Sequence, residues 1–128
     1  MAFKAKLTVG GKEFNVLKVD YSLVQETDAT GRPSYVSRGG KVNFKVESTD
    51  DTTLFEWMTN NFERRSGTLK FLKRDTDATS KELNFTEGYM VKYKEEFDST
   101  GTNPFCESFT ISAREISVGN GEHVNEWV

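Results

Sequence analysis

Residues 41–66 read KVNFKVESTDDTTLFEWMTNNFERRS, and two hydrophobic periods meet within them. In residues 41–47, apolar and polar side chains alternate, which is the period of a strand with one buried face. The next apolar residues fall on one wide helical face instead: Leu54, Phe55, Trp57, Met58 and Phe62. The stretch therefore predicts a strand followed by one helix over about residues 53–66.

Both ends of this helix carry typical terminal signals. Thr53-Leu54-Phe55-Glu56 matches a capping box. Arg64 and Arg65, followed by Gly67, suit the negative end of the helix dipole and a C-cap. Lysines on the outer face of the preceding strand favour an edge position in the sheet.

The flanking sequence keeps the strand period on both sides of this stretch. Residues 3–9 alternate up to a Gly-Gly turn, and residues 13–25 change their inward parity near Leu17, which predicts a bulge or bend. Further strands are expected at 68–73, 81–93 and 106–118, separated by polar turns. We therefore expect one domain over residues 1–128, mainly β, with a single helix.

Composition and charge exclude several classes of function. The chain has 128 residues, a net charge of −3 and ten phenylalanines, which suits one aromatic core. The charge disfavours nucleic acid and anionic lipid as partners. The first residues, MAFKAKL, lack the apolar run of a signal peptide or a membrane span, so we expect export, if it occurs, to need no signal peptide, and we expect no membrane insertion.

No residue pattern indicates catalysis or metal binding. The single histidine, His123, is expected in an exposed polar tail, and the single cysteine, Cys106, is expected to be a buried, inert thiol. Together they cannot supply a zinc cluster. The segment from Asp75 lacks the later ligands of a calcium loop, and Val42 follows Lys41 where a phosphate loop needs Ser or Thr. We predict a non-enzymatic protein without a cofactor or metal.

A long polar loop separates the second and third predicted strands. Residues 26–34 are rich in turn formers and show no apolar period. Loops of this length are usually exposed and often functional. The pattern therefore favours a role in recognition.

Several stretches span nearly the whole chain: MAFKAKL at 1–7, FNVLKVDY at 14–21, DATGRP at 28–33, RGG at 38–40, TLFEWM at 53–58, FTISAR at 109–114 and NEWV at 125–128. Together they resemble the tube protein of the type VI secretion system, the haemolysin-coregulated protein (Hcp) family, in a divergent branch. The resemblance implies a two-sheet β-barrel flanked by one α-helix, like a phage tail tube. It also implies a structural protein rather than an enzyme.

The same resemblance implies how the protein works. Six copies would close into a ring, and rings would stack into a hollow tube that a contracting sheath drives, with a spike, toward a target cell. The implied partners are other copies of the chain and the sheath, spike and effector proteins. Assembly would take place in the cytoplasm, before secretion to the extracellular space or a target cell.

The resemblance further implies that the loop after the second strand contacts the adjacent ring. Here that loop covers residues 26–41, and the candidate stacking residues are Asp28, Thr30, Gly31, Arg32, Pro33, Tyr35, Arg38, Gly39 and Gly40. Glycines permit close approach, arginines pair with carboxylates, and an exposed tyrosine favours an interface. We expect bulky residues at Gly39 or Gly40 to impair stacking without affecting folding. The alternative is a surface loop whose glycines serve only its turns.

Two other functions stay open at this point. A monomeric barrel that binds a small apolar ligand would co-purify with that ligand. An enzyme would be indicated only if an activity vanished on changing His123 or Cys106.

Overall fold

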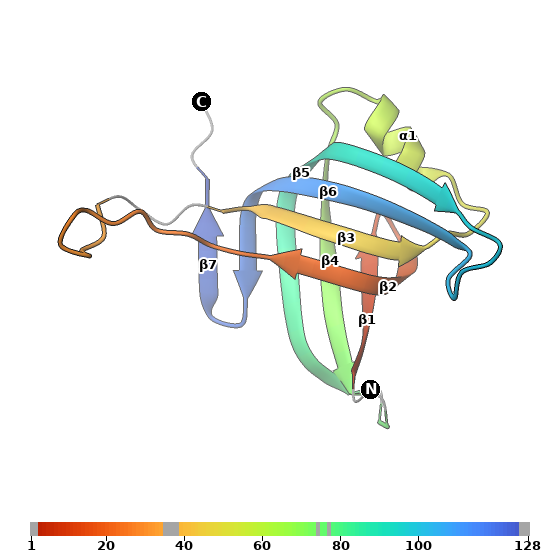
Figure 1. Cartoon of the computed structure of the whole chain (residues 1–128), viewed down its shortest axis with the longest axis horizontal. Helices are drawn as coiled ribbons and strands as arrows, with labels where there is room; N and C mark the ends of the chain where they lie inside the picture. Colours follow the sequence, from red (N-terminus) through yellow and green to blue (C-terminus); the bar gives the residue numbers. More distant parts are fainter. Residues whose placement is uncertain (1–2, 35–38, 74, 77, 126–128) are drawn as a thin grey trace.

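The computed structural model describes residues 3–34, 39–73, 75–76 and 78–125. Its elements, in chain order, are β1 (Phe3–Val9), β2 (Lys12–Tyr21), β3 (Lys41–Glu47), α1 (Thr53–Thr59), β4 (Arg64–Lys73), β5 (Thr79–Phe97), β6 (Phe105–Val118) and β7 (Gly121–Val124). Figure 1 shows the strands curving around one another, with α1 beside β5 and a loop between β2 and β3 that extends away from the strands.

The strands close into a barrel. They are hydrogen-bonded in the order β3-β2-β1-β4-β5-β6-β7. β3, the first strand in this order, also pairs with β6, and this additional pairing closes the barrel. All these pairings are antiparallel. The predicted mainly β barrel with a single helix is therefore confirmed. The predicted irregularity near Leu17 is confirmed too, since the β2–β3 register shifts between Val16 and Lys18.

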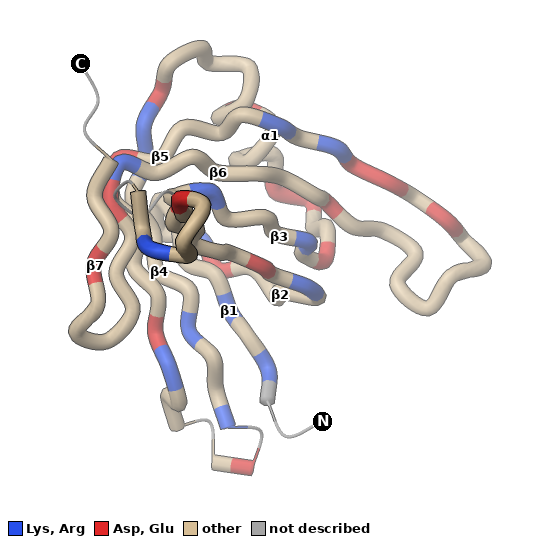
Figure 2. The backbone as a smooth tube through the Cα atoms, turned by 60° about the vertical axis from the view of Figure 1, so that its left-hand side comes forward, with Lys and Arg blue, Asp and Glu red and all other residues tan. Residues whose placement is uncertain are grey.

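The expectation that β3 lies at a sheet edge is wrong. Val42 pairs with Tyr21 of β2 on one side and with Ile111 of β6 on the other. In a closed barrel, outward side chains meet solvent wherever the strand lies, so the lysines mark the outer face and not an edge. Figure 2 shows residues of both charge signs distributed along the strands.

Alternating side chains fill the interior of the barrel. The buried apolar residues include Leu7, Phe14, Val42, Phe44, Leu69, Leu83, Phe85, Phe109 and Ile111. Phe44 and Phe109 stack with their ring centroids 5.1 Å apart. The strand period in the sequence thus reports directly which face each strand buries.

The helix is shorter than predicted. It ends at Thr59, and Arg64 and Arg65 open β4 instead of closing the helix. Asn60 and Asn61 follow the last helical residue, and asparagine competes for backbone hydrogen bonds and so favours helix ends. Gly67 is not a C-cap but a residue of β4, where an added Cβ would lie 2.6 Å from the Phe85 ring.

The predicted capping box does not form. The hydroxyl of Thr53 donates to Asp51 (2.7 Å), and the partner of the Glu56 carboxylate is the hydroxyl of Thr52. The predicted apolar face is also only partly buried, because Leu54 and Trp57 are each 1% exposed whereas Phe55 is 55% exposed. The helix therefore packs on the barrel mainly through Leu54 and Trp57, with Met58 partly buried beside them.

Residues 121–124 form the strand β7, where an exposed tail was predicted. His123 pairs with Ile116 in the β6–β7 ladder and is only 7% exposed, so the expectation of an exposed histidine is wrong. A four-residue strand is too short to show a clear period in the sequence. The buried Cys106 thiol is as predicted. Within the described ranges, no helix is long and apolar enough to cross a membrane.

Candidate assembly surfaces

Residues 22–34 of the β2–β3 loop form a hairpin that extends from the barrel. Figure 1 shows it, in orange, reaching beyond the strand ends. Thr27 and Pro33 form a β-bridge, and the amide of Ser34 donates to the carbonyl of Glu26 (2.7 Å). Residues 22–34 are nearly all exposed. The loop is therefore shaped by its own hydrogen bonds rather than by packing on the barrel.

Asp28 organises the tip of this loop. Its carboxylate accepts hydrogen bonds from the Thr30 amide (2.8 Å), the Thr30 hydroxyl (2.7 Å) and the Arg32 amide (3.1 Å). The Thr30 bonds, and then that of Arg32, hold the pKa of Asp28 below its usual value. Gly31 has φ +88°, which closes the turn. The tip presents a preformed charged surface at neutral pH.

The structure separates the candidate stacking residues into two groups. Asp28, Thr30, Gly31, Arg32 and Pro33 lie together near the exposed tip. Gly39 and Gly40 lie instead at the root, where the chain returns to β3, and Gly40 is buried. Tyr35 and Arg38 lie outside the described residues.

Packing within the chain requires both root glycines. A Cβ added at Gly39 would lie 2.3 Å from Leu23 Cδ2 and 2.8 Å from the Ser22 carbonyl oxygen. At Gly40, which has φ +98°, it would lie 2.3 Å from Asn125 Nδ2. The expectation that bulky residues here would spare folding is therefore wrong. A contact of these glycines with another ring stays a prediction.

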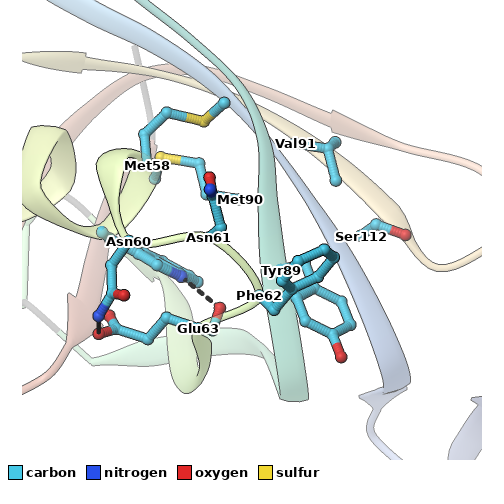
Figure 3. A pocket seen from close by; sticks show the side chains of 10 residues that line it. Met58, Asn60, Asn61, Phe62, Glu63, Tyr89, Met90, Val91 and Ser112 are labelled. Atoms are coloured by element: carbon cyan, nitrogen blue, oxygen red, sulfur yellow. Dashed lines mark hydrogen bonds between the residues drawn. The ribbon is translucent and has the colours of Figure 1, made fainter.

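A second exposed surface lies beside α1. An open hollow of about 590 Å³ is lined by Trp57, Met58, Asn60, Asn61, Phe62, Glu63, Tyr89, Met90, Val91 and Ser112. Figure 3 shows these side chains converging from the end of α1, from the connection to β4, and from β5 and β6. Phe62 is 87% exposed and Val91 is 48% exposed. Clustered exposed apolar side chains are typical of interfaces.

Backbone strain accompanies that exposure. Phe62 has φ 65°, a conformation that bulky residues adopt only at an energetic cost. The sequence pattern placed Phe62 on the apolar face of the helix, so this surface was missed. The Asn60-Asn61 pair that ends the helix was the available signal.

A network of hydroxyl and carboxyl groups surrounds the buried Glu107. Glu107 is 2% exposed, and its carboxyl accepts a hydrogen bond from the Tyr93 hydroxyl (2.8 Å). Ser48 Oγ lies 3.1 Å from Glu107 and 2.6 Å from Glu95. Burial raises the pKa of Glu107, and the neighbouring carboxylates Glu95 and Asp51 raise it further.

This network is structural in its geometry. Both carboxyl oxygens of Glu107 accept hydrogen bonds from hydroxyl groups of the same chain, and its 2% exposure keeps it out of reach of a substrate. Across the part of the chain that the structure describes, no group of three or more His, Cys, Asp or Glu could hold a metal ion. The surfaces best suited to function are therefore the projecting loop and the hollow beside α1.

Comparisons with known proteins agree with this architecture. The family model for hemolysin coregulated protein Hcp (TssD) matches residues 1–128. The structure of Hcp1 from Flavobacterium johnsoniae is 62% identical with a TM-score of 0.92, covering 95% of this chain and 99% of that one. No curated protein sequence matches the chain.

More distant solved structures share the fold alone. Hcp1 from Salmonella typhimurium has 15% identity and a TM-score of 0.75, covering 91% of this chain and 85% of that one. A chain of the PVC sheath-tube complex, an extracellular contractile injection system, has 17% identity and a TM-score of 0.57, covering 90% of this chain and 87% of that one. The chain thus belongs to the Hcp (TssD) family, whose members are structural tube proteins of the type VI secretion system and not enzymes.

Proposed function

We propose that this protein is a non-enzymatic subunit of the type VI secretion inner tube. Residues 1–128 form one tube domain, six copies close into a ring, and rings stack into a hollow tube. A contractile sheath propels this tube, with its spike, to deliver effector proteins. The tube assembles in the cytoplasm. It leaves the cell when the sheath contracts rather than through a signal-peptide pathway. The whole-chain family match carries the proposal.

The number of copies is supported by a structural relative. A chain with a TM-score of 0.55 comes from the baseplate of an anti-feeding prophage whose structure was determined with 6-fold symmetry. A head-to-tail contact closes a ring only when its rotation divides the circle. That likeness supports the proposal of a sixfold ring for this chain.

The projecting loop suits contacts between rings. Its tip is shaped by the Asp28 hydrogen bonds before any partner arrives, so docking costs little ordering entropy. Arg32 is exposed beside it and can pair with a carboxylate on the next copy. The tip residues therefore form the stacking surface.

The hollow beside α1 suits contacts within a ring. Phe62 and Val91 are apolar, exposed and adjacent to it, and a second copy would remove them from water. A monomeric ligand-binding barrel is less favoured, because Phe14, Phe44, Phe85 and Phe109 occupy the barrel interior.

Imaging of the purified chain tests the proposal. Negative-stain microscopy should show rings with sixfold averages, and light scattering should give a mass near six times 14.5 kDa. A strictly monomeric species at high concentration would contradict the tube assignment. A ligand co-purifying with that monomer would instead support the binding barrel.

A further inference from the structure

One edge of β6 has two different partners in succession. Residues 106–112 of β6 pair with β3, and residues 115–118 pair with β7. β5 occupies the other edge along nearly the whole strand. Ala113 and Arg114 therefore lie at a fork where β3 and β7 diverge, and their backbone groups need partners from outside both ladders.

Asn125 supplies partners at this fork. Its amide N–H donates to the Arg114 carbonyl (2.7 Å), and its side-chain Nδ2 donates to the Ala113 carbonyl (3.0 Å). The same Nδ2 donates to the carbonyl of Gly39 (3.1 Å), at the root of the projecting loop. One residue thus joins β6, the end of β7 and the point where the loop returns to β3.

The orientation of the Asn125 amide follows from its partners. Carbonyl oxygens only accept hydrogen bonds, so the group facing Ala113 and Gly39 must be the NH₂ group. Its Oδ1 then faces His123 Nε2 at 3.0 Å, and Nε2 must carry the proton. The buried histidine therefore holds the asparagine in the orientation that binds the loop root.

The loop root is shaped to fit this amide. Gly40 has φ +98°, and a Cβ there would lie 2.3 Å from Asn125 Nδ2. The Gly40 carbonyl accepts a hydrogen bond from the Ala113 amide (2.7 Å), which ties the same point to β6. Gly39, next to Gly40, lies close to Ser22 and Leu23, where the chain leaves β2.

We propose that Asn125 is a positioning residue that sets the direction in which the projecting loop leaves the barrel, and thereby the contact between successive rings. This inference rests on the proposed function, since the adjacent ring of the proposed tube is the partner of the loop tip. Hydrogen bonds to Asp28 shape the tip, and residues 22–34 are exposed rather than packed on the barrel, so a small rotation at the root moves the tip far. A loop with the same tip in the wrong direction would not meet the next ring.

The test replaces Asn125 with aspartate in the full chain. Asn125→Asp keeps the shape but places an acceptor against the carbonyls of Ala113 and Gly39. Asn120→Asp is the matched control, because it makes the same charge change in the exposed β6–β7 turn. Asn125→Ala serves as the second variant if the aspartate prevents folding.

Two readouts separate positioning from general stability. Hydrogen exchange should be about tenfold faster or more in peptides covering residues 39–41 and 113–114, yet nearly unchanged across β4. Micrographs should show rings but few stacks. Val46→Ala, which weakens the core away from the fork, should leave stacking intact at an equal folded fraction.

The outcomes distinguish the inference from the proposed function. Unchanged exchange at 39–41 in Asn125→Asp would overturn the role of Asn125. Faster exchange but normal stacking in Asn125→Asp would overturn the link between Asn125 and assembly. An equal loss of stacking in Val46→Ala would overturn it too. A wild-type chain that forms no rings would instead contradict the proposed function, and the exchange data would still show whether Asn125 holds the loop.

Discussion

Two long connections leave the ends of β3, and they behave in opposite ways. In the first connection, residues 22–34 project into solvent, whereas the connection of residues 48–63 folds back and places α1 against β5. Both are rich in polar residues and turn formers. The difference comes from Leu54 and Trp57, which the second connection buries, while the first leaves Leu23 and Val24 more than half exposed.

The two connections are also held by different interactions. Trp57 donates from Nε1 to the Glu63 carbonyl (2.9 Å), and the Arg65 guanidinium lies 5.5 Å from the centre of its ring. The loop is held by short-range bonds at Asp28 and by Asn125 at its root. The helix connection therefore stabilises the barrel through the buried Trp57 and exposes Phe62 near its end, whereas residues 22–34 of the other connection are exposed throughout.

The largest effect should come from the helix connection. Trp57→Ala should lower the free energy of unfolding by about 3–5 kcal/mol, because it removes a fully buried aromatic side chain. Phe55→Ala is the matched control and should cost about 1 kcal/mol or less, since Phe55 keeps mainly an edge-to-face contact with Tyr93. Urea denaturation measures both, and equal costs would refute the assigned burial.

The root of the projecting loop should be the next most sensitive position. Gly40→Val should cost about 2–3 kcal/mol, because it combines a positive φ with a clash against Asn125. Gly31→Val has a similar φ but open space around it, so it should cost about 1 kcal/mol less. The same unfolding experiment checks this, and identical costs would show that the root is not packed.

The buried Glu107 should make stability depend on pH. Its pKa is raised in the folded protein, so the native state binds the proton more tightly and stability falls as pH rises through the folded pKa. The change in the free energy of unfolding caused by Glu107→Gln, relative to wild type, should therefore be more favourable at pH 8 than at pH 4 by about 1 kcal/mol. Glu122→Gln, at an exposed position, is the control. Parallel pH profiles of wild type and Glu107→Gln would contradict this.

The sequence predicted the strands well because each exposes one face and buries the other. Residues 41–47 match β3, and the parity change at Leu17 marks the bulge. The helix predicted from the sequence is too long, because Phe62 falls on the apolar face of a continued helix. In the structure, the helix has already ended before Asn60 and Asn61. No local pattern could show that His123 and Asn125 lie at the fork of β6, because that depends on pairing between distant strands.

Phe62 tests whether the helix connection serves stability alone. Phe62→Gly should stabilise the isolated subunit by up to about 1 kcal/mol, because glycine tolerates the positive φ and the ring is 87% exposed. Ring formation should weaken, because the exposed ring is lost from the proposed lateral contact. Sedimentation velocity measures the ring fraction, and an unchanged fraction would remove Phe62 from the interface.

The loop tip should show the smallest effect on stability and the clearest effect on assembly. Arg32→Glu changes an exposed side chain and should shift the free energy of unfolding by no more than about 0.5 kcal/mol. Lys81→Glu makes the same kind of charge change at an exposed position on β5 and serves as the control.

Counting stacked rings in electron micrographs of wild type, Arg32→Glu and Lys81→Glu, at matched concentration and with melting curves in parallel, tests the central claim most directly. We predict rings in all three proteins, equal melting temperatures, and stacks that are lost only in Arg32→Glu. Stacks of normal length in Arg32→Glu would contradict the claim that the projecting loop joins successive rings.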